Sequence, residues 1–274
     1  MTQVVTTVAE LRQVLAPLRA GRIGMVPTMG ALHDGHLSLV DAARTACGHV
    51  VVSIFVNPTQ FAPHEDFDAY PRTLDADLAK LGDVDVVFAP TVREMYPEGY
   101  ATTITVGGPS AGLETDFRPH FFAGVATVVG KLLIAALPDA AIFGQKDYQQ
   151  LLVVRRLARD LGLPTEIVGA PIVREADGLA LSSRNAYLSP VERQVAGRLN
   201  LVLKHTIARA RGGDLRAAEA DGAAALKAAG FDTVDYVAIR DAATLAAIET
   251  LDRPARVLAA AKIGRTRLID NMAV

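Results

Sequence analysis

The strongest constraint on the fold is a nearly unbroken run of apolar residues, His-Val-Val-Val-Ser-Ile-Phe-Val, at positions 49–56. A strand with one face in water alternates apolar and polar residues, so an unbroken run indicates a strand that is buried on both faces. Shorter apolar runs occupy positions 23–26, 84–88, 140–143 and 166–168. Strands buried on both faces need helices on each side of their sheet, which predicts a parallel α/β sheet.

Segments with helical spacing of apolar residues separate these strands. In residues 8–19 the apolar side chains fall on one face, and Thr7 before them can act as the N-cap. Further helices are predicted over residues 37–47, 72–81, 123–136 and 147–161. The alternation predicts a Rossmann-like, doubly wound parallel sheet in a first domain of residues 1–171.

The pattern changes after residue 171. Residues 174–178, Arg-Glu-Ala-Asp-Gly, predict a hairpin turn. Ser189 is then placed as an N-cap, Pro190 as the first helical residue and Glu192 as the acid of a capping box, so a long helix is predicted to start here. A second helix near 215–229 and short strands at 235–239, 256–261 and 267–269 complete the prediction. We therefore expect a smaller α+β domain over residues 172–274.

Composition excludes several classes of protein. The chain has 274 residues, a net charge of −2 and no run of Lys and Arg, which argues against a nucleic-acid partner. Its one cysteine, Cys47, excludes a disulfide framework and a cysteine-rich metal site. The longest apolar stretch, at 125–137, contains Lys131 and is too short to span a bilayer. The first residues lack the pattern of a signal peptide, so we expect a soluble cytoplasmic protein.

The clearest chemical signal lies where the strand at 23–26 gives way to a helix, in the stretch Pro-Thr-Met-Gly-Ala-Leu-His-Asp-Gly-His at 27–36. Ligands of doubly wound sheets bind at the carboxyl ends of strands, and helix N-termini attract phosphate. Gly30 and Gly35 allow close approach of the backbone to a ligand. His33 and His36 can donate to phosphate oxygens and stabilise charge in a transition state. A histidine at such a place is more often a cap or a surface residue, and the pair of histidines with two glycines makes both interpretations about equally good.

Polar residues follow two other predicted strands. Gln60, in Asn-Pro-Thr-Gln-Phe after the strand at 49–56, is a neutral donor and acceptor, although an ordinary turn glutamine is the simpler interpretation. Lys146 follows the strand at 140–143 and suits a phosphate as a mobile charge. Asp147 can cap a helix or accept from ribose hydroxyls, and Gln150 is expected to face the same side as Lys146.

Two further segments have both a chemical and a structural interpretation. Leu181-Ser182-Ser183-Arg184 offers two hydroxyls and a guanidinium, which together suit an anion, although a serine-rich loop is the plainer alternative. Asp77 lies in a first helical turn, where an acid usually stabilises the helix dipole, and it can alternatively help to hold Mg²⁺.

Competing nucleotide motifs do not match. Residues 124–131 resemble a P-loop, but the spacing of their glycines is wrong and Leu132 stands where the motif has Ser or Thr. No Gly-x-Gly-x-x-Gly follows a predicted strand, and the chain contains neither His-Glu-x-x-His nor Cys-x-x-Cys. A dinucleotide site and a zinc site of these types are therefore not predicted.

The early His-x-Gly-His turn and the late Ser-Ser-Arg loop resemble the adenylyl-transferring superfamily that includes class I aminoacyl-tRNA synthetases. The strings PTMGALHDGH, FVNPTQF, DAYPRT, GVATVVGKL, FGQKDYQQ and LSSRNAYL are more specific and resemble the pantothenate synthetase (pantoate–β-alanine ligase) family over about residues 20–190. The resemblance implies that pantoate is activated by ATP as an adenylate and then condensed with β-alanine. It also implies Mg²⁺ as cofactor and a homodimer.

Carried over residue by residue, the resemblance implies His36, His33, Lys146 and Arg184 as catalytic residues. It implies that Gln60 and Gln150 bind pantoate and that Asp77 lies near Mg²⁺. The ATP-binding residues that it implies are Met29, Gly30, Ala31, Leu32, His33, Asp34, Gly35, His36, Gly144, Gln145, Lys146, Asp147, Val173, Leu181, Ser182, Ser183 and Arg184.

The sequence departs from the family pattern at a few positions. Phe121 stands where the family usually has histidine, which puts a substrate role of that position in doubt. Thr59 replaces a common methionine, and Leu181 also often appears as methionine. Two alternatives stay open: an adenylyl transferase for a phosphorylated acceptor, and an ATP-binding protein without catalytic activity. A tRNA synthetase is disfavoured because no basic or anticodon-reading extension is present.

Overall fold

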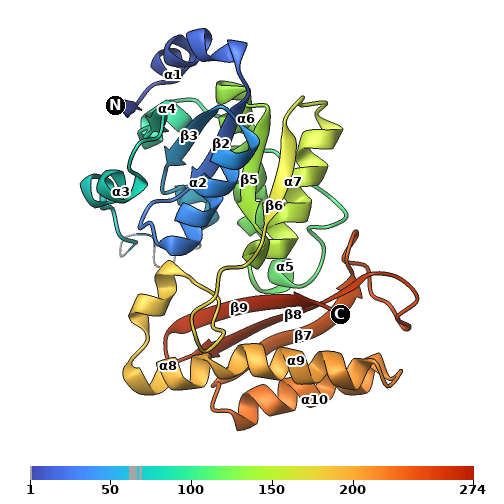
Figure 1. The fold of residues 1–274 in the computed structure, drawn as a ribbon. Helices are drawn as coiled ribbons and strands as arrows, with labels where there is room; N and C mark the ends of the chain where they lie inside the picture. Colours follow the sequence, from blue (N-terminus) through green and yellow to red (C-terminus); the bar gives the residue numbers. More distant parts are fainter. Residues whose placement is uncertain (1, 62–66, 68–69) are drawn as a thin grey trace. The chain divides into compact units, whose positions relative to one another are not determined.

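The computed structural model describes residues 2–61, 67 and 70–274, and the chain separates into two compact units (Figure 1). Unit 1 comprises Met1–Gln145 and Gln150–Pro171, and unit 2 comprises Lys146–Gln149 and Ile172–Val274. Asp68 and Ala69, the first two residues of the DAYPRT segment, lie outside the described residues.

Unit 1 contains a six-stranded sheet in which every pairing is parallel. The strands lie in the order β1-β4-β3-β2-β5-β6, and this confirms the predicted doubly wound sheet. Their bounds are β1 Gln3–Val5, β2 Ile23–Thr28, β3 His49–Ile54, β4 Val86–Phe88, β5 Ala140–Gly144 and β6 Glu166–Ala170. Strand β1 was not predicted, because three residues with two of them exposed carry no periodic signal.

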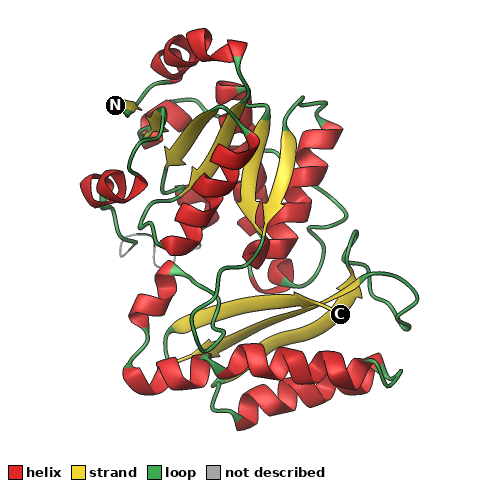
Figure 2. Ribbon diagram, viewed as in Figure 1, coloured by secondary structure: helices red, strands yellow, loops and turns green. Residues whose placement is uncertain are grey.

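Helices lie on both sides of this sheet (Figure 2). Their bounds are α1 Val8–Leu15, α2 Asp34–Ala46, α3 Leu74–Leu81, α4 Val92–Met95, α5 Glu114–Phe117, α6 Phe121–Ala136 and α7 Tyr148–Asp160. Helix α1 is shorter than the predicted 8–19 and continues as a 3₁₀ turn, Ala16–Ala20. Pro17 explains the change, because proline has no N–H to donate within an α-helix and its ring clashes with the preceding turn.

The sheet is buried on both faces, as the apolar runs predicted. Val26, Val52 and Ile142 pack in one cluster with Leu39 and Val40 of α2, and all but Leu39 are at most 1% exposed. Residues of opposite orientation in the same strands, Met25, Val51 and Ala141, are fully buried as well. Burial of a Val, Leu or Ile side chain contributes about 1.5–3 kcal/mol, so packing on both faces stabilises the central strands.

The strand order reverses beside β2. From β2 the chain moves to β3 and β4 in one direction, whereas β5 and β6 extend the sheet in the other direction. Ligands of open α/β sheets bind outside the carboxyl ends of the strands at such a reversal. The turn that follows β2 is the one that carries His33 and His36, so the fold places it at the expected binding position of unit 1.

Unit 2 is the small α+β fold that the sequence predicted. Its antiparallel sheet has the order β7-β8-β9, with β7 Thr233–Asp241, β8 Ala255–Ile263 and β9 Thr266–Ala273. Helix α9, Arg198–Ala210, packs on β8 and β9, and α10, Leu215–Ala228, packs on β7 and α9. The predicted capping box of Ser189 and Glu192 is confirmed at the start of α8, Pro190–Ala196. The predicted long helix is divided, because α8 ends before Gly197 and α9 begins after it.

Among the described residues, no helix combines the length and the apolar character needed to cross a membrane.

Candidate active site

The turn between β2 and α2 is capped by its own two histidines. Helix α2 begins at Asp34, three residues before the predicted start, with His33 as its N-cap. The N–H of Gly35 donates to His33 Nδ1 at 3.1 Å, and the N–H of His33 donates to His36 Nδ1 at 3.4 Å. This reciprocal arrangement is a capping box, which Ser or Thr with Glu or Gln usually forms. The sequence-based boundary was wrong because the usual preferences do not count histidine as a cap.

These two hydrogen bonds also fix where each imidazole carries its proton. A nitrogen that accepts a hydrogen bond has no proton of its own, so each neutral ring is assigned its proton on Nε2. The ring centroids of His33 and His36 lie 4.1 Å apart. The turn therefore presents two neighbouring Nε2–H groups, which can donate to an anion while the rings are uncharged.

Several backbone amides of the turn are bonded within the protein. The N–H of Gly30 donates to Thr28 Oγ1 at 3.2 Å, and the N–H groups of Ala31 and Leu32 donate to the carboxylate of Asp77 at 3.0 and 2.8 Å. The N–H of His36 donates to the carbonyl of His33 at 2.7 Å. These four amides are thus satisfied internally, so the imidazoles are the better candidates for contact with phosphate than the backbone.

Gln60 lies in a short 3₁₀ turn, Pro58–Gln60, that follows β3 and is 8% exposed. Asn57 caps this turn: its Oδ1 accepts from the Thr59 N–H at 3.3 Å and from the Tyr96 hydroxyl at 2.7 Å. The carbonyl of Gln60 accepts from Arg118 Nη2 at 3.1 Å. Sequence reasoning identified Gln60 but gave no role to its supports, although Asn before Pro-Thr is a recognisable cap.

Helix α6 reaches this turn at Gly124, whose carbonyl accepts from Asn57 Nδ2 at 3.2 Å. A Cβ at position 124 would lie 2.4 Å from the Thr59 carbonyl oxygen and 3.1 Å from the Gln60 nitrogen. Only glycine permits this approach, since backbone atoms of the turn occupy the space of a side chain.

Replacement of Gly124 with alanine is therefore expected to lower the free energy of unfolding of unit 1 by about 1–3 kcal/mol, because the added methyl overpacks the contact. Gly107→Ala is the matched control, since a Cβ there meets nothing within 4 Å. Urea unfolding of both variants measures the difference. Equal stability of the two variants would show that the close approach of α6 is not a constraint.

Phe121, which departs from the family pattern, packs against its neighbours. The guanidinium of Arg118 lies 3.9 Å from the centroid of its ring, and the ring of Phe122 lies 5.1 Å away. A cation over an aromatic face is attractive by about 0.5–2 kcal/mol. Phe121 thus contacts the arginine that holds Gln60, through its ring instead of the polar atoms of a histidine.

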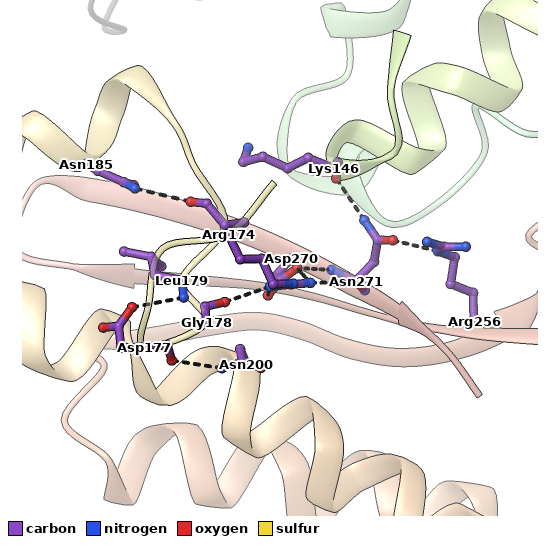
Figure 3. Close-up of polar contacts among 11 residues, drawn as sticks. Lys146, Arg174, Asp177, Gly178, Leu179, Asn185, Asn200, Arg256, Asp270 and Asn271 are labelled. Carbon is purple, nitrogen blue, oxygen red and sulfur yellow. Dashed lines mark hydrogen bonds and ion pairs between the residues drawn. The ribbon is translucent and has the colours of Figure 1, made fainter. Parts of the chain in front are cut away.

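In unit 2, Lys146 and Asp147 lie in the 3₁₀ turn Gln145–Asp147 that precedes α7. Lys146 Nζ is 4.0 Å from Asp147 Oδ2, and the two side chains are 21% and 46% exposed. The carbonyl of Lys146 accepts from Asn271 Nδ2 at 2.8 Å, and Asn271 Oδ1 accepts from Arg256 Nε at 2.5 Å (Figure 3). Strand β9, which carries Asn271, thereby fixes the backbone at Lys146.

Arg256 is held in turn by an aromatic ring. Its guanidinium lies 3.9 Å from the centroid of the Tyr148 ring, and the Tyr148 hydroxyl donates to the carbonyl of Ala242 at 2.8 Å. Burial lowers the pKa of Arg256 from its ordinary value. These contacts order the first residues of α7 against the sheet of unit 2.

The predicted hairpin at 174–178 is present and joins two proposed nucleotide ligands. The N–H of Leu181 donates to the carbonyl of Val173 at 3.0 Å. Ser182 follows as the cap of a 3₁₀ turn, Ser183–Tyr187, and its Oγ accepts from the N–H of Arg184 at 3.3 Å. Val173 and the Leu181–Arg184 segment thus belong to one ordered structure.

Arg174 connects this hairpin to β9 (Figure 3). Its two terminal nitrogens contact the Asp270 carboxylate at 2.6 and 2.8 Å, and the Asp270 side chain is 1% exposed. Nη1 of Arg174 also donates to the carbonyl of Gly178 at 2.9 Å. Neighbouring residues of β9, Asp270 and Asn271, therefore hold the hairpin and the Lys146 segment respectively. The sequence analysis assigned no role to either.

The hairpin has a second anchor on α8. Arg193 donates to Glu175 Oε2 at 2.8 Å and to Asp177 Oδ1 at 3.1 Å. The hydrogen bond from Arg193 holds the pKa of Asp177 below its ordinary value. Asp177 is thus expected to keep its charge, and its contact with Arg193, at neutral pH.

Comparisons with known proteins extend over both units. A family model described as pantoate-beta-alanine ligase matches residues 3–273. The pantothenate synthetase of Mesorhizobium japonicum is 59% identical over 278 residues, which cover 99% of this chain and 98% of that relative. The pantothenate synthetase of Nitrobacter hamburgensis is 58% identical over 275 residues, which cover 98% and 97%.

Solved structures give the same result. The crystal structure of pantoate-beta-alanine ligase (pantothenate synthetase) from Thermus thermophilus is 50% identical, with a TM-score of 0.92 and 99% of each chain covered. That of Francisella tularensis, complexed with beta-gamma ATP and beta-alanine, is 34% identical, with a TM-score of 0.84 and coverage of 99% and 97%. The family model, the sequence relatives and the structures agree along nearly the full length, and the chain belongs to the pantoate–β-alanine ligase family.

Proposed function

We propose that this ligase condenses pantoate with β-alanine in two steps at the carboxyl ends of its parallel strands. A carboxylate oxygen of pantoate first attacks the α-phosphorus of ATP, and the bond to pyrophosphate breaks. The amine of β-alanine then attacks the acyl carbon of the pantoyl adenylate, loses a proton and expels AMP. The observation that carries the proposal is the pair of mutually capped histidines in the turn after β2, in a chain that matches the ligase family throughout.

The chemistry at phosphorus needs positioned donors more than a covalent catalyst. We assign His33 and His36 to the phosphate oxygens, through the Nε2–H groups that the caps leave as donors. A well-placed donor of this kind contributes about 3–4 kcal/mol to the transition state, or about 10²–10³-fold in rate.

The remaining ATP ligands are proposed from both units. Lys146, Ser182, Ser183 and Arg184 supply further donors, while Asp147 and the backbone of Gly144 suit the ribose. The ordering of the Lys146 segment and of the hairpin by β9 supports these assignments, because donors act best when they are held in place before the reaction. A closing movement of unit 2 that shields the adenylate from water belongs to the same proposal.

Gln60 and Gln150 are proposed to bind pantoate. A cationic clamp would hold the carboxylate firmly but would lower its nucleophilicity, whereas neutral amides orient it and leave its charge available for attack. Gln60 is well suited, because Asn57 and Arg118 fix its backbone.

Replacement of Gln60 with leucine is expected to raise the KM for pantoate about 10- to 100-fold, the effect of losing a hydrogen bond to a charged group. The KM for ATP should change little. Gln13→Leu is the control, since Gln13 is exposed on α1. Steady-state kinetics with each substrate varied in turn would count against the assignment if both KM values rose together.

Mg²⁺ is proposed to enter with ATP, held mainly by phosphate oxygens and water, as this ion commonly is. The residues described by the structure contain no group of three or more side chains suited to a metal. Asp77, the predicted metal ligand, is 1% exposed, and both of its oxygens accept backbone N–H groups. Asp77 therefore fits poorly as a ligand of the ion. The homodimer and the cytoplasmic location that the resemblance implies belong to the same proposal.

The direct test of the function is pyrophosphate release from ATP and Mg²⁺, measured with pantoate alone and with pantoate plus β-alanine. We expect release that depends on pantoate, and continuous AMP formation only when β-alanine is added. ATP binding without pantoate-dependent release would remove the substrate assignment, and phosphorylated acceptors would then be the compounds to assay.

A further inference from the structure

A buried carboxylate lies under the histidine turn. Asp77 is in the first turn of α3 and is 1% exposed. Its Oδ1 accepts from the Leu32 N–H at 2.8 Å, and its Oδ2 accepts from the Ala31 N–H at 3.0 Å and from the Thr73 hydroxyl at 3.4 Å. Each oxygen of the side chain is thus directed to a donor of the protein itself.

The backbone of the turn has a conformation that needs such a partner. Gly30 has a φ of +82° and Ala31 a φ of +51°. A left-handed conformation costs an L-residue such as alanine about 1–2 kcal/mol. Successive N–H groups in turns of this kind converge and bind anions. The carboxylate of Asp77 supplies that anion from within the chain and offsets the cost of the strained backbone.

Lys80 contacts the same segment from the next turn of α3. Its Nζ donates to the carbonyl of Leu32 at 2.6 Å. The amide and the carbonyl of Leu32 are therefore both bonded to side chains of α3, and the Leu32 side chain is itself 1% exposed in the core with α2. Leu32 directly precedes His33, so the position of the cap depends on these contacts.

We propose that Asp77, supported by Lys80, is a positioning residue that fixes the backbone of the His33–His36 turn, and that it is not a ligand of Mg²⁺. The role in catalysis rests on the function proposed above for the two histidines. Asp77 itself reaches no reacting atom, and it acts through the conformation of residues 30–33.

The test is Asp77→Asn, which keeps the shape of the side chain but turns an NH₂ group toward one of the two amides. Asp75→Asn is the matched control, because Asp75 lies in the same helical turn and is exposed. Hydrogen exchange of a peptide over residues 29–37, measured without ATP or metal, reports the backbone directly. We expect the amides of Ala31 and Leu32 to exchange about 10- to 100-fold faster in Asp77→Asn only.

Kinetics separate positioning from metal binding. A small displacement of a catalytic group costs about 10²-fold, so kcat of Asp77→Asn is expected to fall by that order. The Mg²⁺ concentration for half-maximal activity should stay within about twofold of the wild-type value, which is the range of context-dependent variation. Lys80→Met is a second variant that leaves the carboxylate in place, and a smaller acceleration of exchange is expected for it.

Unchanged exchange at Ala31 and Leu32 would overturn the proposal, and so would a raised requirement for Mg²⁺ with unaltered exchange. Faster exchange with unchanged kcat would support Asp77 as the anchor of the turn and would contradict the catalytic role of the histidines. The two proposals can therefore fail separately.

Discussion

Replacement of His36 with asparagine should leave the protein folded and lower kcat about 10²–10³-fold. The oxygen of asparagine can take the place of Nδ1, which accepts from the His33 N–H at 3.4 Å, so the start of α2 keeps its cap. Asparagine has no group at the position of Nε2–H, and the donor to phosphate is lost. The change thus separates capping from chemistry, which an alanine substitution would remove together.

The rate of pyrophosphate release in a single turnover is the measurement, with circular dichroism to verify the fold. His205→Asn is the control, because His205 is exposed on α9. His36→Gln provides the opposite case: its longer side chain can bring an amide N–H near the position of Nε2, so it should retain more activity than asparagine. Near-normal turnover of His36→Asn would overturn the catalytic assignment of His36.

Replacement of Asp270 with alanine should destabilise unit 2 by about 3–5 kcal/mol. The carboxylate is 1% exposed and accepts two hydrogen bonds from Arg174, so its removal leaves a largely buried guanidinium without its charged partner. The loss should also release the hairpin, since Arg174 joins that segment to β9. Urea unfolding followed by a probe in unit 2 measures the effect.

A surface ion pair provides the control for this prediction. Arg22 and Glu166 are 3.3 Å apart, but their side chains are 56% and 67% exposed. Glu166→Ala is therefore expected to change stability by no more than about 1 kcal/mol. The double change Arg174→Met with Asp270→Leu should cost less than Asp270→Ala alone, because it leaves no buried charge. Similar losses for Asp270→Ala and Glu166→Ala would show that the buried pair does not hold the hairpin.

The sequence was informative where structure depends on neighbouring residues. The apolar run at 49–56 predicted a sheet buried on both faces, and Ser189 with Glu192 predicted a helix start that the structure confirms. Both signals arise from contacts within a few positions along the chain. The same local reasoning placed the start of α2 too late, because histidines form its caps.

Contacts between distant residues could not be predicted in this way. Asp77 is 46 positions from Ala31 and 45 from Leu32, and its spacing within α3 resembled that of an ordinary acid near a helix N-terminus. Asp270 and Asn271 acquire their roles only when β9 lies beside the hairpin and the Lys146 segment. The sequence thus indicated the groups that are proposed to contact substrate but not the residues that hold them.

The most direct test of the central claim is the fate of the pantoate carboxylate oxygens. Pantoate whose carboxylate carries a heavy oxygen isotope should be converted with ATP and β-alanine, and the products examined by mass spectrometry. If the carboxylate attacks the α-phosphorus, one labelled oxygen leaves with AMP when the amine displaces it. Label in inorganic phosphate, or in neither AMP nor pyrophosphate, would contradict activation as an adenylate and with it the role assigned to the histidine turn.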